Sequence, residues 1–189
     1  MAVFPVVVDA NELYGILPAD FLITTAGRKL YRLHWSERIL DEAERNLRVN
    51  RPDIVNKISE RFAIMQRAMP EAMVESPDEA LVEAMTNHPG GRHVLATAVS
   101  IGAEIIVTEN SKHFDEPSLR PHGVEVRTLH EFAIDLVSLN ADEVWATILE
   151  IAGRRRNPPT TPAEVCAELE RYMPNAVALL QTFERFWTE

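Results

Sequence analysis

Short, continuous apolar runs recur along the first part of the chain and end in polar residues. Runs of this kind that are rich in Val and Ile are typical of strands buried on both faces of a parallel sheet. We therefore predict strands at residues 3–8, 30–35, 104–108 and 124–126, and a further short strand near residues 73–74.

Between the predicted strands, apolar residues recur every three or four positions, which is the spacing of a helix with one buried face. The predicted helices cover residues 11–17, 19–26, 37–49, 78–85, 92–101 and 128–139, and one more runs from Pro52 to just before Pro70. Ser36 suits the N-cap of one helix and Gly102 the C-cap of another. Alternating strands and helices over residues 1–139 predict an α/β domain with a parallel sheet flanked by helices.

The strand pattern stops after residue 139, and the remaining apolar positions have helical spacing. We predict helices at residues 141–155, 162–172 and 174–187, with a linker at 154–159. Residues 140–189 are therefore interpreted as a helical C-terminal extension of a domain at residues 1–139. Three aromatic side chains are expected to pack this extension onto the domain or onto a partner: Phe183, Phe186 and Trp187.

Composition and charge narrow the classes of protein to consider. No apolar run approaches the ~20 residues of a membrane span, and the first residues lack the basic segment of a secretory signal. We therefore expect a cytoplasmic protein that does not bind membranes. Cys166 is the only cysteine, which excludes an intrachain disulfide. The net charge of −10 argues against broad, non-specific nucleic-acid binding, but it does not exclude a nuclease and it suits a basic partner.

Polar side chains follow two of the predicted core strands. Asp9 ends the first strand, and Thr108 and Asn110 end the central one. Glu42 lies in the first long helix. Polar groups beyond the carboxyl ends of parallel strands mark the usual ligand site of an open α/β sheet. Oxygen ligands of this kind suit Mg²⁺ or Mn²⁺, which polarise a phosphodiester and activate water.

Each of these residues also has a purely structural interpretation. Asp9 suits a turn or an N-cap, Asn110 suits a cap on the following loop, and Glu42 suits the solvated face of an acidic helix. Spacing alone therefore leaves two alternatives, an acidic metal site and an α/β domain without one.

Four segments resemble the motifs of the PIN-domain family, metal-dependent ribonucleases that include VapC-type toxins. Residues 7–14, Val-Val-Asp-Ala-Asn-Glu-Leu-Tyr, resemble the first motif, and residues 34–47 resemble the second. Residues 92–99 resemble the third motif and residues 107–114 the fourth. Arg-Asn-Pro-Pro at residues 156–159, followed by a capped helix, resembles one PIN subgroup, so the resemblance spans nearly the whole chain.

The resemblance implies an endoribonuclease that depends on Mg²⁺ or Mn²⁺. It places Asp9 and Glu42 at metal-ligand positions, with Asn110 as the further ligand at the fourth position. Thr108 takes the place of a supporting hydroxyl. The resemblance also implies the toxin of a type II toxin–antitoxin pair, with structured RNA such as tRNA as the substrate and an antitoxin protein as a partner. A homodimer is a further expectation.

One position departs from the family pattern. Gly91 stands where the family has an acidic residue, just before an Arg-His pair. Glycine is tolerated at a helix N-cap, so we expect the fold to persist while the metal site loses a ligand and a charge. The alternatives are an introduced inactivating change, a naturally degenerate toxin, and a substitute ligand. The candidate substitutes are Glu109, which adjoins Asn110, and three histidines: His88, His93 and His113.

Basic residues near the motifs offer contacts to RNA phosphates. We assign four as candidate RNA-binding residues: Arg28, Lys29, Arg32 and Arg92. A solvated turn is the alternative interpretation of the first three. Because of Gly91, the alternative to a nuclease is a catalytically inactive PIN-fold module that binds RNA or an antitoxin.

Overall fold

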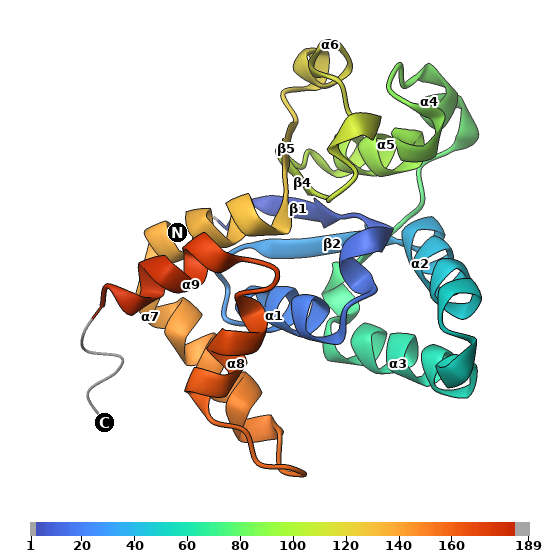
Figure 1. Ribbon diagram of the computed structural model, residues 1–189. Helices are drawn as coiled ribbons and strands as arrows, with labels where there is room; N and C mark the ends of the chain where they lie inside the picture. Colours follow the sequence, from blue (N-terminus) through green and yellow to red (C-terminus); the bar gives the residue numbers. More distant parts are fainter. Residues whose placement is uncertain (1–2, 184–189) are drawn as a thin grey trace.

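The computed structural model describes residues 3–183, which form a five-stranded parallel sheet with flanking helices (Figure 1). The strands lie in the order β3-β2-β1-β4-β5, so the first strand of the chain is central. They are β1 (Pro5–Val8), β2 (Arg32–Ser36), β3 (Met73–Val74), β4 (Ile105–Val107) and β5 (Glu125–Arg127). The predicted parallel sheet is confirmed, with each strand close to its expected bounds.

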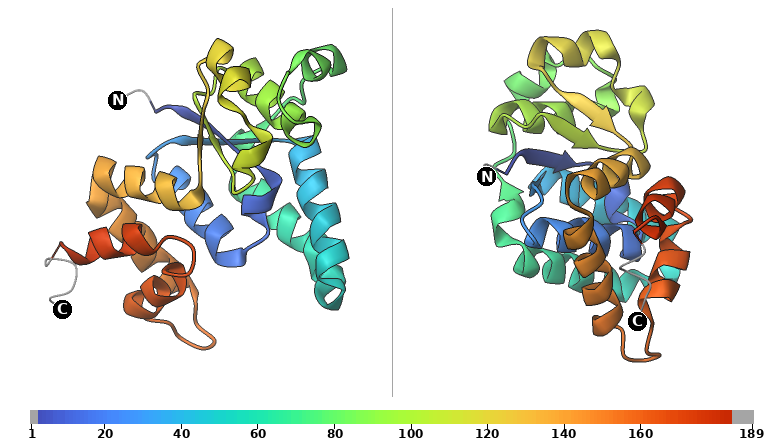
Figure 2. Two further views of the ribbon diagram at one scale, coloured as in Figure 1. Left: turned by 45° about the horizontal axis from the view of Figure 1, so that its top comes forward. Right: turned by 90° about the vertical axis from the view of Figure 1, so that its left-hand side faces the viewer.

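Helices cover both faces of the sheet, with α1 on one side and α5 on the other (Figures 1 and 2). They are α1 (Ile16–Gly27), α2 (Glu37–Asn50), α3 (Val55–Ala68), α4 (Glu79–Ala84), α5 (Arg92–Ile101), α6 (Glu116–Leu119), α7 (Leu129–Arg154), α8 (Pro162–Leu169) and α9 (Pro174–Gln181). Ser36 caps α2, and Gly102 ends α5 in the left-handed conformation, as predicted. Across residues 3–183, no helix is both long and apolar enough to cross a bilayer.

The predicted division of the first helical region at Pro18 is wrong. The chain forms a short 3-10 helix, η1 (Ala10–Leu13), and α1 begins only at Ile16, after Gly15. Pro18 therefore lies in the first turn of α1. Proline is tolerated there because the N–H groups of a first turn have no partner within the helix.

The core forms where the central strands meet the helices. The side chains of β1 from Val6 to Val8 are fully buried, as is Trp35 on β2. Tyr31 packs edge-on against Phe132 of α7, with ring centroids 4.9 Å apart. These contacts anchor the first half of α7 to the sheet and fix the strands whose carboxyl ends carry the polar residues.

Helix α7 has a break at Asn140, the residue at which we predicted the C-terminal extension to begin. Asn140 has non-helical dihedral angles (φ −161°, ψ 89°), and its Oδ1 accepts a hydrogen bond from the Glu143 N–H. The two helices predicted on either side of residue 140 are therefore confirmed. The second half of α7 packs against α8 and α9, which end earlier than expected, at Leu169 and Gln181. The boundary at residues 139 and 140 stays a prediction.

One of the three C-terminal aromatic residues can be placed. Phe183 is partly buried and packs against the core, which agrees with its expected role. Phe186 and Trp187 lie outside the described residues.

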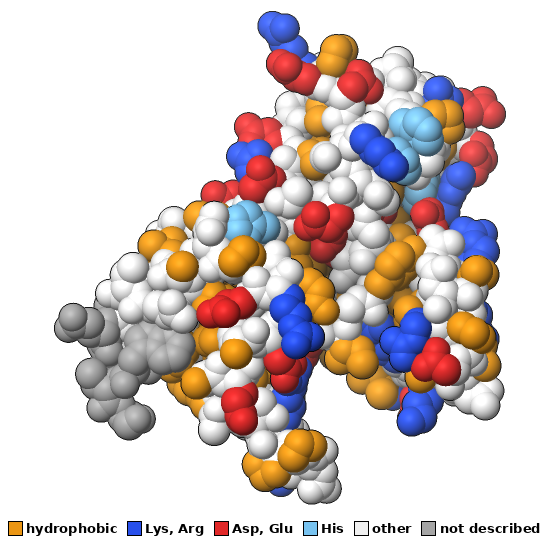
Figure 3. Space-filling view, viewed as in Figure 1, with side chains coloured by type: hydrophobic (Ala, Val, Ile, Leu, Met, Phe, Trp, Pro, Cys, Tyr) orange, Lys and Arg blue, Asp and Glu red, His pale blue; other side chains and the backbone are white. Residues whose placement is uncertain are grey.

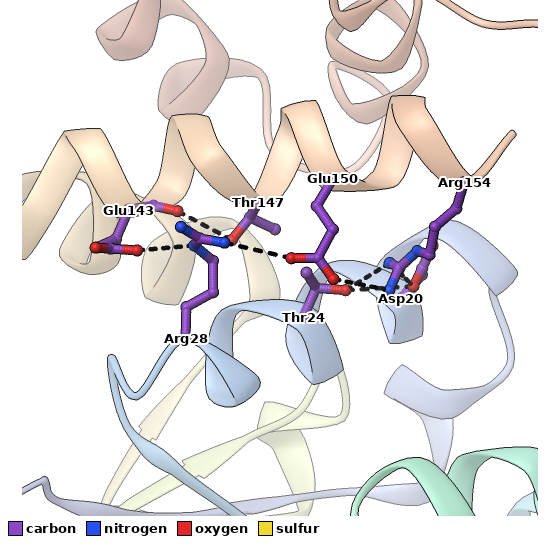
Figure 4. Close-up of polar contacts among 7 residues, drawn as sticks. All are labelled: Asp20, Thr24, Arg28, Glu143, Thr147, Glu150 and Arg154. Atoms are coloured by element: carbon purple, nitrogen blue, oxygen red, sulfur yellow. Dashed lines mark hydrogen bonds and ion pairs between the residues drawn. The ribbon is translucent and has the colours of Figure 1, made fainter.

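A polar network joins α1 to the second half of α7 (Figure 4). Arg28 lies 2.7 Å from Glu143 and 3.3 Å from Glu150, measured between the closest side-chain nitrogen and oxygen atoms. Arg154 lies 2.6 Å from Asp20 in the same way. All of these side chains are partly exposed, so each pair contributes at most about 1 kcal/mol. Their number and geometry fix how the extension sits on the domain.

Candidate functional site

Asp9 and Thr108 come together because β1 and β4 pair in parallel. The register that joins Val8 to Val107 places the next two residues side by side at the carboxyl edge of the sheet. Thr108 Oγ1 donates to Asp9 Oδ2 over 2.7 Å, and the Ala10 N–H donates to Asp9 Oδ1 over 2.7 Å. Burial raises the pKa of the Asp9 carboxyl above its ordinary value, and the Thr108 hydrogen bond opposes this rise.

Thr108 connects three parts of this edge. Its fully buried Oγ1 also accepts hydrogen bonds from the Asn110 N–H and from Asn11 Nδ2, each over 3.0 Å. The structure therefore brings Thr108 and Asn110 beside Asp9, at the edge where we expected them. The role of Asn110 as a ligand stays a prediction.

Glu42 reaches the same edge from α2. Ser36 ends β2 and caps α2 through a hydrogen bond from the Ile39 N–H, so the helix starts at the carboxyl edge and Glu42 falls in its second turn. Glu42 Oε2 lies 3.2 Å from His93 Nε2 on α5. This contact lowers the pKa of Glu42, while the Glu42 charge helps to raise the pKa of Asp9. The two carboxylates are thus close enough to interact electrostatically.

Glu12 is a buried carboxylate that the sequence interpretation missed. It is 3% exposed, and its Oε1 accepts a hydrogen bond from the Glu109 N–H over 2.8 Å. Burial, together with the charge of Glu109, raises the pKa of Glu12 to about 7. The only signal in the sequence was its position one short turn after Asp9. Glu109 itself accepts a hydrogen bond from the Leu129 N–H over 3.1 Å, so its carboxylate faces the start of α7.

Gly91 is buried at the start of α5, and side chains from two other segments surround it. A Cβ atom there would lie 2.9 Å from Asn87 Nδ2, 2.9 Å from Phe114 Cζ and 3.1 Å from His113 Cβ. These distances are shorter than ordinary contacts, so a side chain at this position requires its neighbours to move. Side chains of other segments thus occupy the space directly beside Gly91.

Two histidines lie beside Gly91. The rings of His88 and His113 stack with centroids 4.2 Å apart and an interplanar angle of 9°. His88 Nδ1 accepts a hydrogen bond from the Gly90 N–H over 3.1 Å. Burial and the neighbouring His88 lower the pKa of His113. The side chains beside residues 90 and 91 are therefore imidazole rings rather than carboxylates.

The four candidate RNA-binding residues fall at two different ends of the sheet. Arg92 lies at the carboxyl edge, where its Nε donates to the Asn87 carbonyl over 3.1 Å. Arg28, Lys29 and Arg32 lie just before or at the start of β2, which is the opposite edge. Arg28 is also held by the ion pairs of Figure 4. Of the four, only Arg92 therefore lies at the edge of the sheet that carries Asp9, and RNA contact by any of the four stays a prediction.

The oxygen atoms at the carboxyl edge suit a cation that takes only a few of its ligands from the protein. Among residues 3–183, no three acidic, His or Cys side chains are already arranged to hold a metal ion. Mg²⁺ nevertheless binds proteins through one or two carboxylates, completed by waters and substrate phosphate oxygens. Asp9 and Glu42 supply two carboxylates, and each oxygen has lone pairs for more than one partner. The residues present thus fit a cation that shares its ligands with substrate.

A groove of about 770 Å³ adjoins this edge. Asn11 and Glu12 line it on the domain side, and Arg171 and Tyr172 line it on the C-terminal extension. Figure 3 shows the molecule hollowed between the C-terminal helices and the α2–α3 pair, with both acidic and basic side chains on the walls. The groove places the extension next to the candidate site.

Comparison with known families decides what this scaffold is. The PIN-domain family model matches residues 5–112, which is more than half of the chain. The chain belongs to the PIN-domain family. A second model, the VapC50 C-terminal domain, matches residues 131–182.

A curated relative supports the same assignment. The chain is similar to the "Putative ribonuclease VapC50" of Mycobacterium tuberculosis (strain ATCC 25618 / H37Rv), with 37% identity over 98 residues. The matched region covers 52% of this PIN-domain chain and 58% of that relative. No solved structure matches the chain.

Proposed function

We propose that this PIN-domain protein is an endoribonuclease that uses Mg²⁺ or Mn²⁺ held by Asp9 and Glu42. The observation that supports it most is at the carboxyl edge of the sheet, where Thr108 holds the Asp9 carboxylate and the charge of Glu42 acts on it. A cation bound there would polarise a phosphodiester and activate water.

The residues around the two carboxylates have separate roles in this proposal. Thr108 fixes the orientation of the Asp9 carboxylate through its hydroxyl and favours the ionised form. Asn110, whose N–H is held by the same hydroxyl, completes the ligand set. Arg92, at the start of α5, contacts a substrate phosphate.

We extend the proposal to a toxin of a type II toxin–antitoxin pair that acts on structured RNA such as tRNA. The match to the VapC50 C-terminal domain and the name of the similar mycobacterial protein support this extension. An antitoxin protein is the expected partner. The acidic net charge of −10 suits a partner with a basic surface.

The direct test is cleavage of purified total tRNA with Mn²⁺ or Mg²⁺. We expect the chain to cut, and Asp9→Asn and Glu42→Gln each to abolish cutting. Asp41→Asn is the matched control, because Asp41 is the exposed acidic neighbour of Glu42 on the same helix. Equal cutting by the original chain and Asp9→Asn would refute the assigned site.

A second function is favoured by the packing around Gly91. The space for a third carboxylate is occupied by Asn87 and Phe114, which agrees with a PIN-fold module that binds RNA or an antitoxin without cutting. That module would bind Mn²⁺ weakly and leave tRNA intact. Gly91→Asp is informative only with its folding measured alongside, because the new side chain must displace its neighbours.

A further inference from the structure

The groove of about 770 Å³ beside the candidate site is lined by two parts of the chain (Figure 3). On the domain side lies Asn11, whose Nδ2 donates to Thr108 Oγ1 over 3.0 Å. Thr108 in turn donates to Asp9, so this part of the groove adjoins a proposed cation ligand. The C-terminal extension contributes Arg171 and Tyr172. An RNA chain with a phosphodiester at Asp9 therefore has the extension beside it.

Arg171 and Tyr172 lie in a well-anchored turn between α8 and α9. The N–H groups of Tyr172 and Met173 both donate to the Leu169 carbonyl over 2.9 Å. Leu169 and Met173 are buried, whereas Tyr172 is 44% exposed and Arg171 is exposed as well. The apolar residues thus fix the turn and leave an aromatic ring and a guanidinium at the surface of the groove.

Two arginines line the groove, and they differ in their partners. Arg51 lies 2.8 Å from Asp53, measured between the closest side-chain nitrogen and oxygen atoms. Arg171 forms no ion pair with any side chain among residues 3–183. A free guanidinium suits an anion such as a phosphate, which it binds through two parallel hydrogen bonds. The charge of Arg171 is therefore available to a ligand.

Acidic residues line the groove close to the ends of β1 and β4. Glu12 and Glu109 both belong to its lining, and Glu109 is exposed. Asn11 adds an amide oxygen, Oδ1, that has no hydrogen-bond partner in the part of the chain that the structure describes. Carboxylates repel phosphates but accept hydrogen bonds from the N–H groups at the edges of nucleobases. A nucleotide in the groove would therefore point its base toward the domain and its phosphate toward Arg171.

We propose that the groove binds an unpaired nucleotide of the RNA substrate next to the scissile phosphate, with its base stacked on Tyr172 and a phosphate held by Arg171. The inference rests on the proposed nuclease function and adds that the RNA is single-stranded where it is recognised. Aromatic rings stack on any base, and the edge of a base is free to meet Glu109 only when the base is unpaired. The loops of a structured RNA supply such nucleotides.

The test is RNA binding to the full chain in EDTA, which removes divalent cations and so prevents cutting. Fluorescence anisotropy measures the affinity for a labelled oligouridylate, alone and paired with oligoadenylate, over a range of salt concentrations. The variants are Tyr172→Leu, Tyr172→Phe and Arg171→Gln. Arg67→Gln is the matched control, because Arg67 is an exposed arginine on α3 that likewise has no ion pair within residues 3–183. Circular dichroism checks that each variant folds.

We expect the single strand to bind more tightly than the duplex. Tyr172→Leu should weaken single-strand binding about 10-fold, whereas Tyr172→Phe keeps the ring and should bind like the original chain. Arg171→Gln should reduce the slope of log affinity against log salt by about 0.7, the share of one phosphate contact. Arg67→Gln should leave the affinity and the slope unchanged.

Single-strand binding that is the same in the original chain, Tyr172→Leu and Arg171→Gln would overturn the inference. The groove would then be left to a protein partner such as an antitoxin. Duplex binding as tight as single-strand binding would also overturn it.

Cleavage of the same RNA with Mn²⁺, below saturation, separates the inference from the proposed function. Equal cutting by the original chain and Tyr172→Leu would keep the nuclease and overturn the role of the groove. Binding that depends on Tyr172 in a chain that does not cut would support RNA binding in the groove and refute the proposed nuclease function.

Discussion

Replacing Thr108 with valine tests the contact that holds the site together. Valine has nearly the shape of threonine but cannot form hydrogen bonds. The change removes the donor to Asp9 Oδ2 and the acceptor for the Asn110 N–H and for Asn11 Nδ2. Thr108 is fully buried, so water cannot easily replace these bonds.

The size of the effect follows from the three bonds. The bond to the Asp9 carboxylate is worth about 1.5–3 kcal/mol, and each neutral bond about 1 kcal/mol. Asn11 is only partly buried, so its amide can form a hydrogen bond with water instead, which offsets part of the free energy lost with this bond. We expect Thr108→Val to lower the free energy of unfolding by about 3 kcal/mol. Thr108→Ser keeps the hydroxyl and should cost only about 1 kcal/mol for the lost methyl group.

Urea unfolding followed by circular dichroism measures both variants. Thr25→Val is the matched control, because Thr25 is also fully buried but its hydroxyl donates to the helical carbonyls of Phe21 and Leu22 and has no contact with a carboxylate in the described residues. We expect the control to cost about 1 kcal/mol or less. If Thr108→Val costs no more than Thr25→Val, the reasoning about Thr108 is refuted. An NMR titration should also show a higher pKa for Asp9 in Thr108→Val, since the lost bond favours the carboxylate.

Three further variants test other contacts. Because burial raises the pKa of Glu12 from 4.5 to about 7, its ionisation costs free energy only in the folded chain, and stability falls as the pH rises through about 7. Glu12→Gln does not ionise, so its free energy of unfolding should rise relative to that of the original chain by up to about 3 kcal/mol between pH 4 and pH 8, as measured by urea unfolding. A difference that does not change with pH would contradict the raised pKa. Arg61 donates hydrogen bonds to the backbone carbonyls of residues 13–15, so Arg61→Lys should lower the free energy of unfolding by about 2 kcal/mol in thermal melts. The control Arg67→Lys, on the same helix, should not show this loss. Arg154→Ala should cost less than about 1 kcal/mol, and a loss that does not shrink with added salt would contradict the surface ion-pair interpretation.

The features that sequence predicted well depend on neighbouring residues. The buried strand at Val6–Val8 is a local run of β-branched residues, and the caps at Ser36 and Gly102 depend on one residue each. Thr128 and Glu131 form the complete capping box that their spacing predicts. Such signals need no knowledge of the rest of the fold.

The features that sequence could not predict depend on residues far apart in the chain. The packing that fills the space at Gly91 comes from Asn87 and Phe114, and the partner of Glu42 is His93 on another helix. The partner of the buried Glu12 is likewise the backbone N–H of Glu109, which follows β4. Spacing along one helix cannot show such contacts. The resemblance to a family supplied the positions of Asp9 and Glu42, but not their surroundings.

Gly91 affects the fold and the chemistry of this protein in different ways. Gly91 caps α5 without a side-chain hydrogen bond, and the neighbouring segments pack into the space that a side chain would need. The fold therefore accommodates glycine at this position, because side chains of other segments cover the start of the helix. The chemistry does not have this freedom, because the proposed cation site depends on the carboxylates of Asp9 and Glu42 at this edge. Membership of the PIN-domain family rests on the match of the family model to residues 5–112, whereas the proposed cation and activity rest on the groups at this edge of the sheet.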